Sequence, residues 1–438
     1  MSIALRKCRF VLIPIDYDHF SVLEHADIIV EDGRIACIGD RCEKPRGVDS
    51  IDCSEAVAIP AFGNAHTHAA MVSLRGYADD YELFEWLDVV WRAERFIDSD
   101  AVRYGTRLAC IEMSMGGVGA FQDMYYHPEV VAEEARRAGL RVRTGPIAGM
   151  HSLDLRPWLA RSNHLFKPVI NVHALYTLDR DVLEEAFENA KRFGVDVHIH
   201  LSETRREVYL VRRKFGYTPV EVLERMGWLS DRVVAVHLNW VTSWELQYLA
   251  RSRAKAVICP VNGGKLAVGS FPPFREMIDA GIVTGMGSDG ACSANRLSIL
   301  TQVRTAILLY RLSYWDTRVR ASNALYAATV GSYLAMGFEP PTMRVGAPAD
   351  IAIISLRKPW MRPARSSRVL SEVAYSAEDS DVVTTIVGGR IVWSADRAEE
   401  VLKEVEHCEK MLSRFIDRAE EAREKALGSE KPPFIKKS

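Results

Sequence analysis

The feature that most constrains this fold is an alternation of short apolar runs with longer helical patterns between about residues 60 and 340. Near-continuous runs of Val, Ile and Ala suit strands that are buried on both faces, as in a parallel sheet. Eight such repeats favour a closed TIM-like (β/α)8 barrel of the α/β class, although an open sheet with extra helices also fits the pattern. The predicted strands are Ala58–Ala65, Val118–Met124, Arg141–Ile147, Val169–Val172, Asp196–His200, Val233–Leu238, Ala256–Pro260 and Val283–Ser288.

The two ends of the chain carry a second pattern, of short strands joined by tight turns. Residues 26–35 contain an apolar run, an Asp-Gly turn and another strand-like run, which is typical of a hairpin. Strand-like runs return at residues 350–354 and 382–392, and the second of these is divided by a Gly-Gly turn. Both ends are therefore expected to build one small β-sandwich domain.

These patterns divide the chain into three parts. We expect a composite β domain of residues 1–58 and 345–395, a barrel of residues 59–344, and a C-terminal helix and tail of residues 396–438. The helix should span about residues 398–425, where apolar positions recur at helical spacing, and the tail from residue 428 should be frayed.

Composition excludes several classes of partner. The 438 residues are 48% hydrophobic and 26% charged, as in an ordinary globular protein. A formal net charge of −2 gives no electrostatic reason to expect nucleic acid or an anionic membrane as partner. The apolar stretch at residues 10–15 is too short for a signal-peptide core or a membrane span, and no other segment reaches spanning length. A cytoplasmic protein is expected.

The eight cysteines are scattered along the chain, without a CxxC pair or regular spacing. In a chain of this length, such scatter indicates buried reduced thiols rather than a disulfide framework.

Polar residues gather where the predicted strands end, and barrel active sites collect at the carboxyl ends of strands. His66 and His68 follow the first strand with i, i+2 spacing, so both side chains point to the same side. His200 ends the fifth strand, His237 the sixth, and Asp289 the eighth. One such histidine would be unremarkable in a core. Four imidazoles and a carboxylate suit a borderline divalent ion, zinc or iron, and predict a metal-dependent hydrolase.

Two residues near His200 receive different interpretations. Glu203 lies just past the strand end, where a carboxylate can reach the pocket beside the ion and burial would raise its pKa. We expect Glu203 to move a proton to the leaving atom; the alternative is a solvated glutamate that opens the next helix. His198, in the same predicted strand, is expected to point away from the side that His200 faces and to contribute to core packing.

Several segments resemble motifs of the amidohydrolase superfamily. Residues 60–68 resemble its strand-one signature, and residues 200–203, 235–237 and 287–290 resemble its later metal and catalytic motifs. Residues 71–94 look like the branch that contains the 5'-methylthioadenosine/S-adenosylhomocysteine deaminases and the triazine hydrolases. Both ends of the chain also match, at residues 30–35 and 346–350.

The resemblance implies a role for each matching residue. It implies one ion, zinc or iron, held by His66, His68, His200 and Asp289. No lysine ends the fourth strand, which argues against a carbamate-bridged pair of ions. The implied catalytic roles are proton shuttle for Glu203, orientation of the attacking water for His237, and acceptance of a proton from that water for Asp289. The implied substrate contacts are His173 and Glu94, with Glu94 holding ribose hydroxyls.

The chain departs from the family pattern in three segments. Residues 259–266 read Cys-Pro-Val-Asn-Gly-Gly-Lys-Leu where relatives usually read Asn-Pro-x-Ser-Asn-x-Lys-Leu, so two expected polar side chains are changed. Residues 86–94 are one residue shorter than usual. Residues 143–156 do not align with arginines that, in relatives, cross from a neighbouring subunit to grip a substrate carboxylate. These departures weigh against S-adenosylhomocysteine more than against deamination.

Our first interpretation is an aminohydrolase that acts on an adenosine-type nucleoside, such as 5'-methylthioadenosine, S-adenosylhomocysteine or adenosine. Hydroxide adds to the amino-bearing ring carbon, Glu203 protonates the ring nitrogen, and ammonia leaves, while His237 and the ion stabilise the developing charge. The alternatives are a hydrolase of another heterocycle (a free base, a triazine or a cyclic amide) and a non-catalytic barrel scaffold. A small heterocyclic substrate and assembly into a homo-oligomer are expected.

Overall fold

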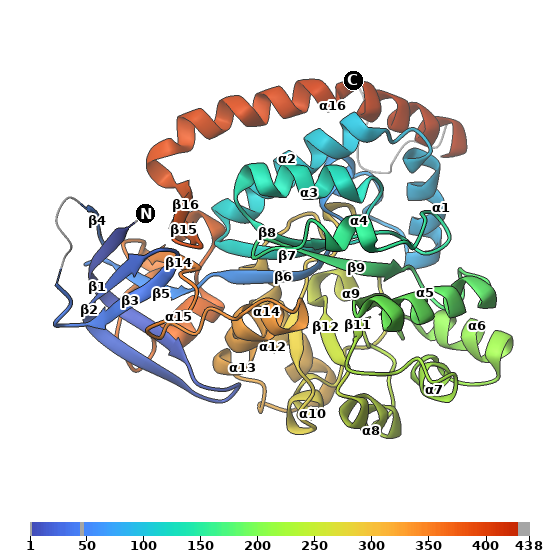
Figure 1. Ribbon diagram of the computed structural model, residues 1–438, viewed down its shortest axis with the longest axis horizontal. Helices are drawn as coiled ribbons and strands as arrows, with labels where there is room; N and C mark the ends of the chain where they lie inside the picture. The colour runs from blue at the N-terminus through green and yellow to red at the C-terminus, as the bar shows by residue number, and fades with distance from the viewer. Residues whose placement is uncertain (1, 44–47, 428–438) are drawn as a thin grey trace.

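The computed structural model describes residues 2–43 and 48–427, and at its centre is a near-closed barrel of parallel strands (Figure 1). Each barrel strand pairs with the next one in chain order, from β6 to β13. The predicted fold class, a (β/α)8 barrel with a separate sheet from both chain ends, is confirmed. The barrel strands are β6 (Phe62–Thr67), β7 (Val118–Asp123), β8 (Arg141–Thr144), β9 (Phe166–Val172), β10 (Asp196–Leu201), β11 (Val233–His237), β12 (Lys255–Ile258) and β13 (Thr284–Met286).

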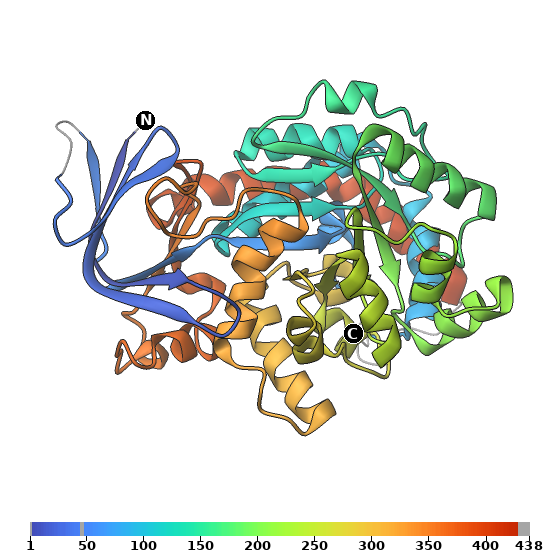
Figure 2. The same ribbon diagram turned by 60° about the horizontal axis from the view of Figure 1, so that its bottom comes forward.

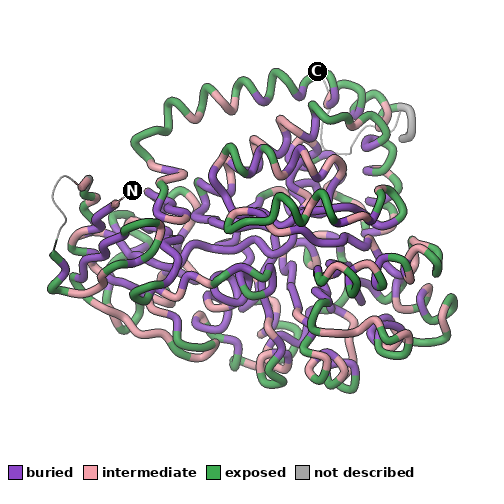
Figure 3. The backbone as a smooth tube through the Cα atoms, in the orientation of Figure 1, coloured by how far each residue is buried: buried purple, intermediate pink, exposed green. Residues whose placement is uncertain are grey.

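The barrel strands are buried along almost their whole length, as the purple core of Figure 3 shows. Strands covered on both faces need apolar side chains in both directions, which explains why the sequence shows continuous apolar runs instead of alternation.

The barrel closes where its first strand meets its last. The backbone N–H of Asp289, beyond β13, donates to the carbonyl of His66 in β6 at 3.1 Å. A Cβ atom at Gly287 would lie 2.7 Å from the Cβ atom of His66, so this close approach requires glycine. The seam places the polar ends of the first and last strands at one point.

Helices cover the outside of the barrel (Figure 2). In α5, for example, Leu183, Ala186, Phe187 and Ala190 are buried at the spacing of one helical face. The helices up to the end of the barrel are α1 (Leu83–Glu94), α2 (Ser99–Met115), α3 (Pro128–Ala138), α4 (Arg156–Leu159), α5 (Arg180–Phe193), α6 (Arg205–Phe215), α7 (Pro219–Arg225), α8 (Ser243–Ser252), α9 (Pro260–Lys265), α10 (Phe274–Asp279), α11 (Ala291–Ala294), α12 (Ile299–Tyr314), α13 (Ala321–Tyr326) and α14 (Ser332–Ala335).

The two chain ends together form a mixed sheet of eight strands in the order β16-β15-β14-β5-β1-β2-β3, with β4 paired to β1. One apolar cluster joins residues from both ends, among them Leu5, Ile28 and Ile353. The strands are β1 (Ile3–Pro14), β2 (Phe20–Glu31), β3 (Arg34–Gly39), β4 (Asp49–Asp52), β5 (Ala56–Pro60), β14 (Ile351–Ser355), β15 (Val382–Val387) and β16 (Arg390–Ser394).

The single strand predicted at 58–65 is in fact two strands in different sheets. β5 pairs with β14 in the mixed sheet, and β6 begins at Phe62 in the barrel. Pro60 has no N–H to donate, and the N–H of Ala61 bonds the carbonyl of Asp350 while that of Phe62 bonds the carbonyl of Gly117. The chain therefore changes sheets within two residues, which a continuous apolar run does not reveal.

After α15 (Val369–Tyr375), the chain ends in the long helix α16 (Ala398–Leu427), which lies along α1 and α2 (Figure 1). Its buried face contains Leu412 and Phe415, and most of its other positions are exposed (Figure 3). The frayed tail predicted from residue 428 lies outside the described residues. No helix within residues 2–43 and 48–427 combines the length and apolar character needed to cross a membrane.

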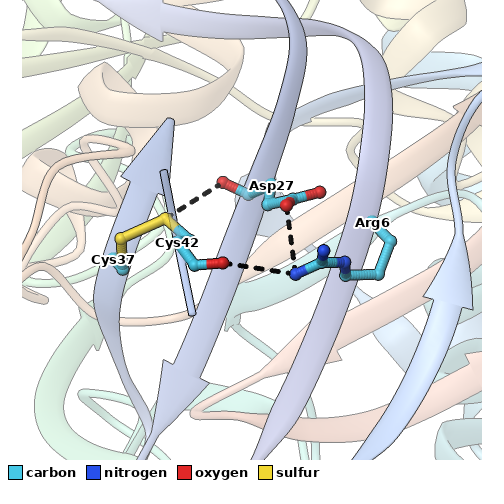
Figure 4. The surroundings of a disulfide bond; sticks show 4 residues. All are labelled: Arg6, Asp27, Cys37 and Cys42. Atoms are coloured by element: carbon cyan, nitrogen blue, oxygen red, sulfur yellow. Dashed lines mark hydrogen bonds and ion pairs between the residues drawn. A yellow bond between two sulfur atoms is a disulfide. The ribbon is translucent and has the colours of Figure 1, made fainter. Parts of the chain in front are cut away.

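A disulfide corrects the expectation that all cysteines are reduced thiols. Cys37 and Cys42 are bonded, with Cα atoms 5.8 Å apart. Figure 4 shows the pair beside Arg6, whose guanidinium donates to the carbonyl of Cys42 and contacts the carboxylate of Asp27. The chain turns back after β3 and brings two cysteines within bonding range, which their spacing alone did not indicate. The remaining cysteines are free and buried.

A buried ion pair ties the barrel to the mixed sheet. Asp350, just before β14, accepts from Arg141 of β8 at 2.6 and 2.8 Å. Its carboxylate also accepts from the hydroxyl of Tyr333 at 3.0 Å and the N–H of Gly388 at 2.7 Å. The charge is therefore fully paired and hydrogen-bonded, which a buried ion pair requires.

Substitution D350A should destabilise the protein by about 3–5 kcal/mol, because it leaves Arg141 charged and buried without a partner. Chemical denaturation followed by circular dichroism measures the loss. The control is R34A, which breaks the exposed pair of Arg34 with Glu339 and should change stability little. Equal effects of the two substitutions would contradict this account of how the barrel and the sheet are joined.

Candidate active site

The carboxyl ends of the barrel strands bring histidines and an aspartate together. His66 lies in β6 with His68 just after it, His200 lies in β10, His237 ends β11, and Asp289 follows β13. The ligand atoms of His66, His68 and Asp289 lie within 4.8 Å of one another, as do those of His66, His200 and His237. The two sets share His66, so they form one cluster.

The nitrogen and oxygen atoms of this cluster approach one another closely. Oδ1 of Asp289 lies 3.4 Å from Nε2 of His66 and 3.2 Å from Nε2 of His68. Nε2 of His66 lies 3.2 Å from Nε2 of His200. All these side chains except the slightly exposed His68 are buried.

Hydrogen bonds on the far side of each ring fix its tautomer. Nδ1 of His68 lies 2.5 Å from the carbonyl of Met124, and Nδ1 of His200 lies 2.7 Å from the carbonyl of His173. A carbonyl only accepts, so each Nδ1 carries a proton, and each ring in its neutral form presents the lone pair of Nε2 to the cluster. Nε2 of His200, Nε2 of His66 and the carboxylate of Asp289 thus offer closely spaced ligand atoms. The donor set therefore fits a divalent metal ion.

His198 corrects the expectation that it only packs the core. It is fully buried, but its Nε2 lies 2.8 Å from Nδ1 of His66. The expected direction was also wrong, because i, i+2 spacing along a strand puts His198 on the same side of β10 as His200. Both side chains therefore point into the barrel interior, where they contact His66.

Three residues at strand ends have unusual backbone conformations. The φ angles of Ser202, His237 and Asp289 are 55°, 76° and 62°. Residues other than glycine adopt positive φ at a cost of about 1–3 kcal/mol, and such residues cluster at active sites. The strained positions here are the ends of β10, β11 and β13, where the cluster lies.

Glu203 is buried and its surroundings favour the protonated form. Burial, followed by the charge of Asp289, raises the pKa of Glu203 to about 8, although a hydrogen bond from Asn262 opposes the rise. Oε1 of Glu203 lies 3.6 Å from Nε2 of His237. Burial lowers the pKa of His237 to about 4, so this imidazole is neutral near pH 7.

Asp289 behaves in the opposite way. Burial alone would raise the pKa of its carboxyl group, yet the facing imidazoles of His66 and His68 hold it well below its ordinary value. Asp289 is therefore an anion while Glu203 carries a proton at neutral pH. Two carboxyl groups in one site with separated pKa values are typical of acid–base catalysis.

Two adjoining cavities open from the cluster. The smaller is lined by Glu203, His237 and Asp289, among others. The larger, of about 350 Å³, is lined mainly by apolar side chains, such as Met71, Trp91 and Ile147. His68, His173, Trp86 and Leu87 line both cavities.

Glu94 and His173 both line the larger cavity. Glu94, the last residue of α1, accepts from the hydroxyl of Tyr125 at 2.6 Å. Burial raises the pKa of Glu94 to about 7, although the bond from Tyr125 opposes this. His173 follows β9, and its ring contacts those of His200 and Trp91 with centroids 5.1 and 6.0 Å apart.

Sequence reasoning missed the side chains that hold these groups in place. Tyr125 lies two residues past the end of β7, so its position beyond a strand could have indicated it. Asn239 donates to the carbonyl of Glu203 at 3.1 Å, and Glu207 accepts from the N–H groups of Ser202 and Glu203. Asn239 and Glu207 lie in loop and helix segments whose approach to Glu203 depends on the tertiary fold.

A comparison with known protein families agrees with this arrangement of histidines and carboxylates at the strand ends. Residues 57–392 match the amidohydrolase family. The chain belongs to the amidohydrolase family. Enzymes of this family are metal-dependent hydrolases, so the hydrolase predicted from the strand-end residues is confirmed, as is the family resemblance.

Two relatives match nearly the whole chain. A 5'-deoxyadenosine deaminase of Methanothrix thermoacetophila is 35% identical over 404 residues, which cover 90% of this chain and 96% of the relative. A 5-methylthioadenosine/S-adenosylhomocysteine deaminase of Pyrococcus furiosus is 36% identical over 392 residues, which cover 86% of this chain and 92% of the relative.

A solved structure is also similar to this chain. The crystal structure of an adenosine deaminase from Xanthomonas campestris with bound zinc superposes with a TM-score of 0.88 at 26% identity. The superposition covers 94% of this chain and 98% of that one.

Proposed function

We propose that this chain is an aminohydrolase that uses one metal ion to deaminate an adenosine-type nucleoside. The observation that carries the proposal is the position of Glu203, a buried carboxyl group with a raised pKa. It lies beside the histidine–aspartate cluster and lines the smaller cavity, which adjoins the one of about 350 Å³. The relatives named above act on such nucleosides according to their names, which supports the same substrate class for this chain.

In this proposal His66, His68, His200 and Asp289 hold one zinc or iron ion. When bound, a divalent ion supplies Lewis acidity, which lowers the pKa of a water ligand to about 7. The chain contributes the orientation of the His68 and His200 rings, which their Nδ1 hydrogen bonds to backbone carbonyls hold with Nε2 toward the ion, and the anionic carboxylate of Asp289. Against the effect of burial, Asp289 raises the pKa of His68 to about 9, so binding of the ion at His68 releases a proton.

The chain's own residues move the protons. Glu203 is protonated at neutral pH and gives its proton to the ring nitrogen next to the amino-bearing carbon. His237, neutral and 3.6 Å from Glu203, orients the attacking water. Asp289, an anion, accepts a proton from that water. Protonation of the ring makes the amino-bearing carbon open to attack by water. The proton that Asp289 has accepted then passes to the amino group, which leaves as ammonia, and the added hydroxyl returns its proton to Glu203.

The larger cavity is the proposed binding site of the nucleoside. Its volume of about 350 Å³ lies in the range typical of small-molecule sites. In its ionised form, Glu94 can accept two charge-assisted hydrogen bonds from neighbouring ribose hydroxyls, while His173 contacts the base. Adenosine, 5'-methylthioadenosine and S-adenosylhomocysteine all present this base and sugar.

Purified protein should contain close to one equivalent of zinc or iron per chain, measured by inductively coupled plasma mass spectrometry. Substitutions H66A and D289A should lose both the metal and activity, because each removes a ligand. H164A, which changes an exposed histidine far from the cluster, should keep both. Two tightly held equivalents per chain would overturn the proposal of a single ion.

Substitution E203Q should lower kcat by about 10² to 10⁴, which is the typical loss when general acid–base catalysis is removed. Glutamine is nearly isosteric and leaves the proposed ligands untouched, so the metal content should persist. The matched control is E188Q at an exposed glutamate, which should turn over normally. Wild-type turnover by E203Q would show that another group shuttles the proton.

Adenosine and 5'-methylthioadenosine should release ammonia faster than free adenine or cytosine in a coupled ammonia assay. A 2',3'-dideoxy analogue should react at least about a hundredfold more slowly than adenosine, because it leaves buried Glu94 with the hydrogen bond from Tyr125 but without those from the ribose. E94A should erase most of this preference and retain the metal. If free bases or triazines outrun every nucleoside, the hydrolase assignment stands and the nucleoside assignment falls.

A further inference from the structure

The segment that departs most from the family pattern, residues 259–266, forms the short helix α9 beside Glu203. Cys259 ends the extended backbone after β12, and Pro260 opens the helix, where its missing N–H costs no hydrogen bond. The predicted strand 256–260 therefore stops early and turns inward. This turn carries the altered residues to the edge of the active site.

Asn262 lies at the centre of this segment and is completely buried. Its Nδ2 donates to Oε1 of Glu203 at 3.1 Å. Its Oδ1 has no hydrogen-bond partner among the described residues, although it too is buried. Burial of an asparagine whose side-chain oxygen lacks a hydrogen bond costs free energy. The hydrogen bond from its Nδ2 to Glu203 is therefore the physical reason for its place here.

The backbone of Glu203 is held separately. Asn239 donates to its carbonyl at 3.1 Å, and the carboxylate of Glu207 accepts its N–H at 2.6 Å. These contacts hold the backbone of Glu203 in place, but they leave its side chain free to rotate. Among the described residues, Asn262 is the one that makes a hydrogen bond to the carboxyl group of Glu203.

We propose that Asn262 is a positioning residue that holds Oε1 of Glu203 as an acceptor and so confines the transferable proton to Oε2. The reason is chemical: an amide N–H donates to a carbonyl-type or carboxylate oxygen, whereas a protonated hydroxyl oxygen accepts poorly. The neutral acid therefore has its O–H on the oxygen that Asn262 does not bind. This inference rests on the proposed role of Glu203 as proton shuttle.

The same hydrogen bond favours the transfer step. When Oε2–H breaks and the proton joins the ring nitrogen, the electron pair stays on the carboxyl group, which becomes an anion. Hydrogen bonds to a charged acceptor are about twice as strong as those to a neutral one. The bond from Asn262 thus strengthens as Glu203 gives up its proton, and the stabilisation appears in the transition state more than in the bound substrate.

The kinetic test uses N262L, which removes the donor at similar volume, and N262D, which replaces the donor by an acceptor in the same shape. Each should lower kcat by about 10- to 100-fold with KM little changed, because the lost interaction develops in the transition state. Metal content should stay at the wild-type level. In an E203Q background, N262L should add little further loss, since both changes remove one coupled pair.

The matched control is G264A, which lies on the same helix, is exposed, and places its methyl group 3.8 Å from the nearest side-chain atom. This variant should have wild-type kinetics. Wild-type kcat in N262L, or additive losses in N262L combined with E203Q, would overturn the inference.

A spectroscopic test separates this inference from the proposed function. The infrared carbonyl band of protonated Glu203 is identified in the metal-containing full chain as the band that E203Q removes. In N262L it should move to higher frequency, because the carbonyl loses its hydrogen-bond donor. If wild-type protein deaminates no nucleoside, the proposed function fails, yet a shifted band still supports the role of Asn262. An unshifted band overturns that role, whatever the substrate is.

Discussion

The structure depends on one constraint at the barrel mouth: imidazole nitrogens and a carboxylate converge on one point. Nδ1 of His68 and Nδ1 of His200 each donate to a backbone carbonyl, so neither ring can turn that proton inward without losing a hydrogen bond. Nε2 of His66 lies close to Nε2 of His200 and to the carboxylate of Asp289, which Nε2 of His68 also approaches. Such a donor set fits a divalent cation, and the glycine seam between β6 and β13 keeps it compact.

The two catalytic carboxyl groups share this environment but differ in charge because of their neighbours. Asp289 faces imidazoles that stabilise its anion, whereas Glu203 faces the charge of Asp289 and gains only the bond from Asn262. One site thereby contains a base and an acid at the same pH. Glu94 lies farther out, in the apolar cavity, where its charge has the sugar as the proposed partner.

Much of the barrel and of its histidine–aspartate cluster could be predicted from sequence. The carboxyl ends of the strands in a parallel barrel converge, so histidines that follow different strands are expected to lie close together. What failed depended on tertiary contacts. The apolar run across Pro60 hid a change of sheet. The prediction for His198 was wrong because i, i+2 spacing puts it on the same side of β10 as His200, where it contacts His66. The spacing of Cys37 and Cys42 gave no sign of their bond. The division of the chain into three parts and the roles of the site residues stay predictions.

The most direct test of the central claim is anomalous diffraction from crystals of the full chain, recorded on both sides of the zinc and iron absorption edges. The account predicts a single peak, at one of these edges, between the Nε2 atoms of His66, His68 and His200 and the carboxylate of Asp289. The absence of any peak there, or two peaks within the barrel mouth, would contradict it.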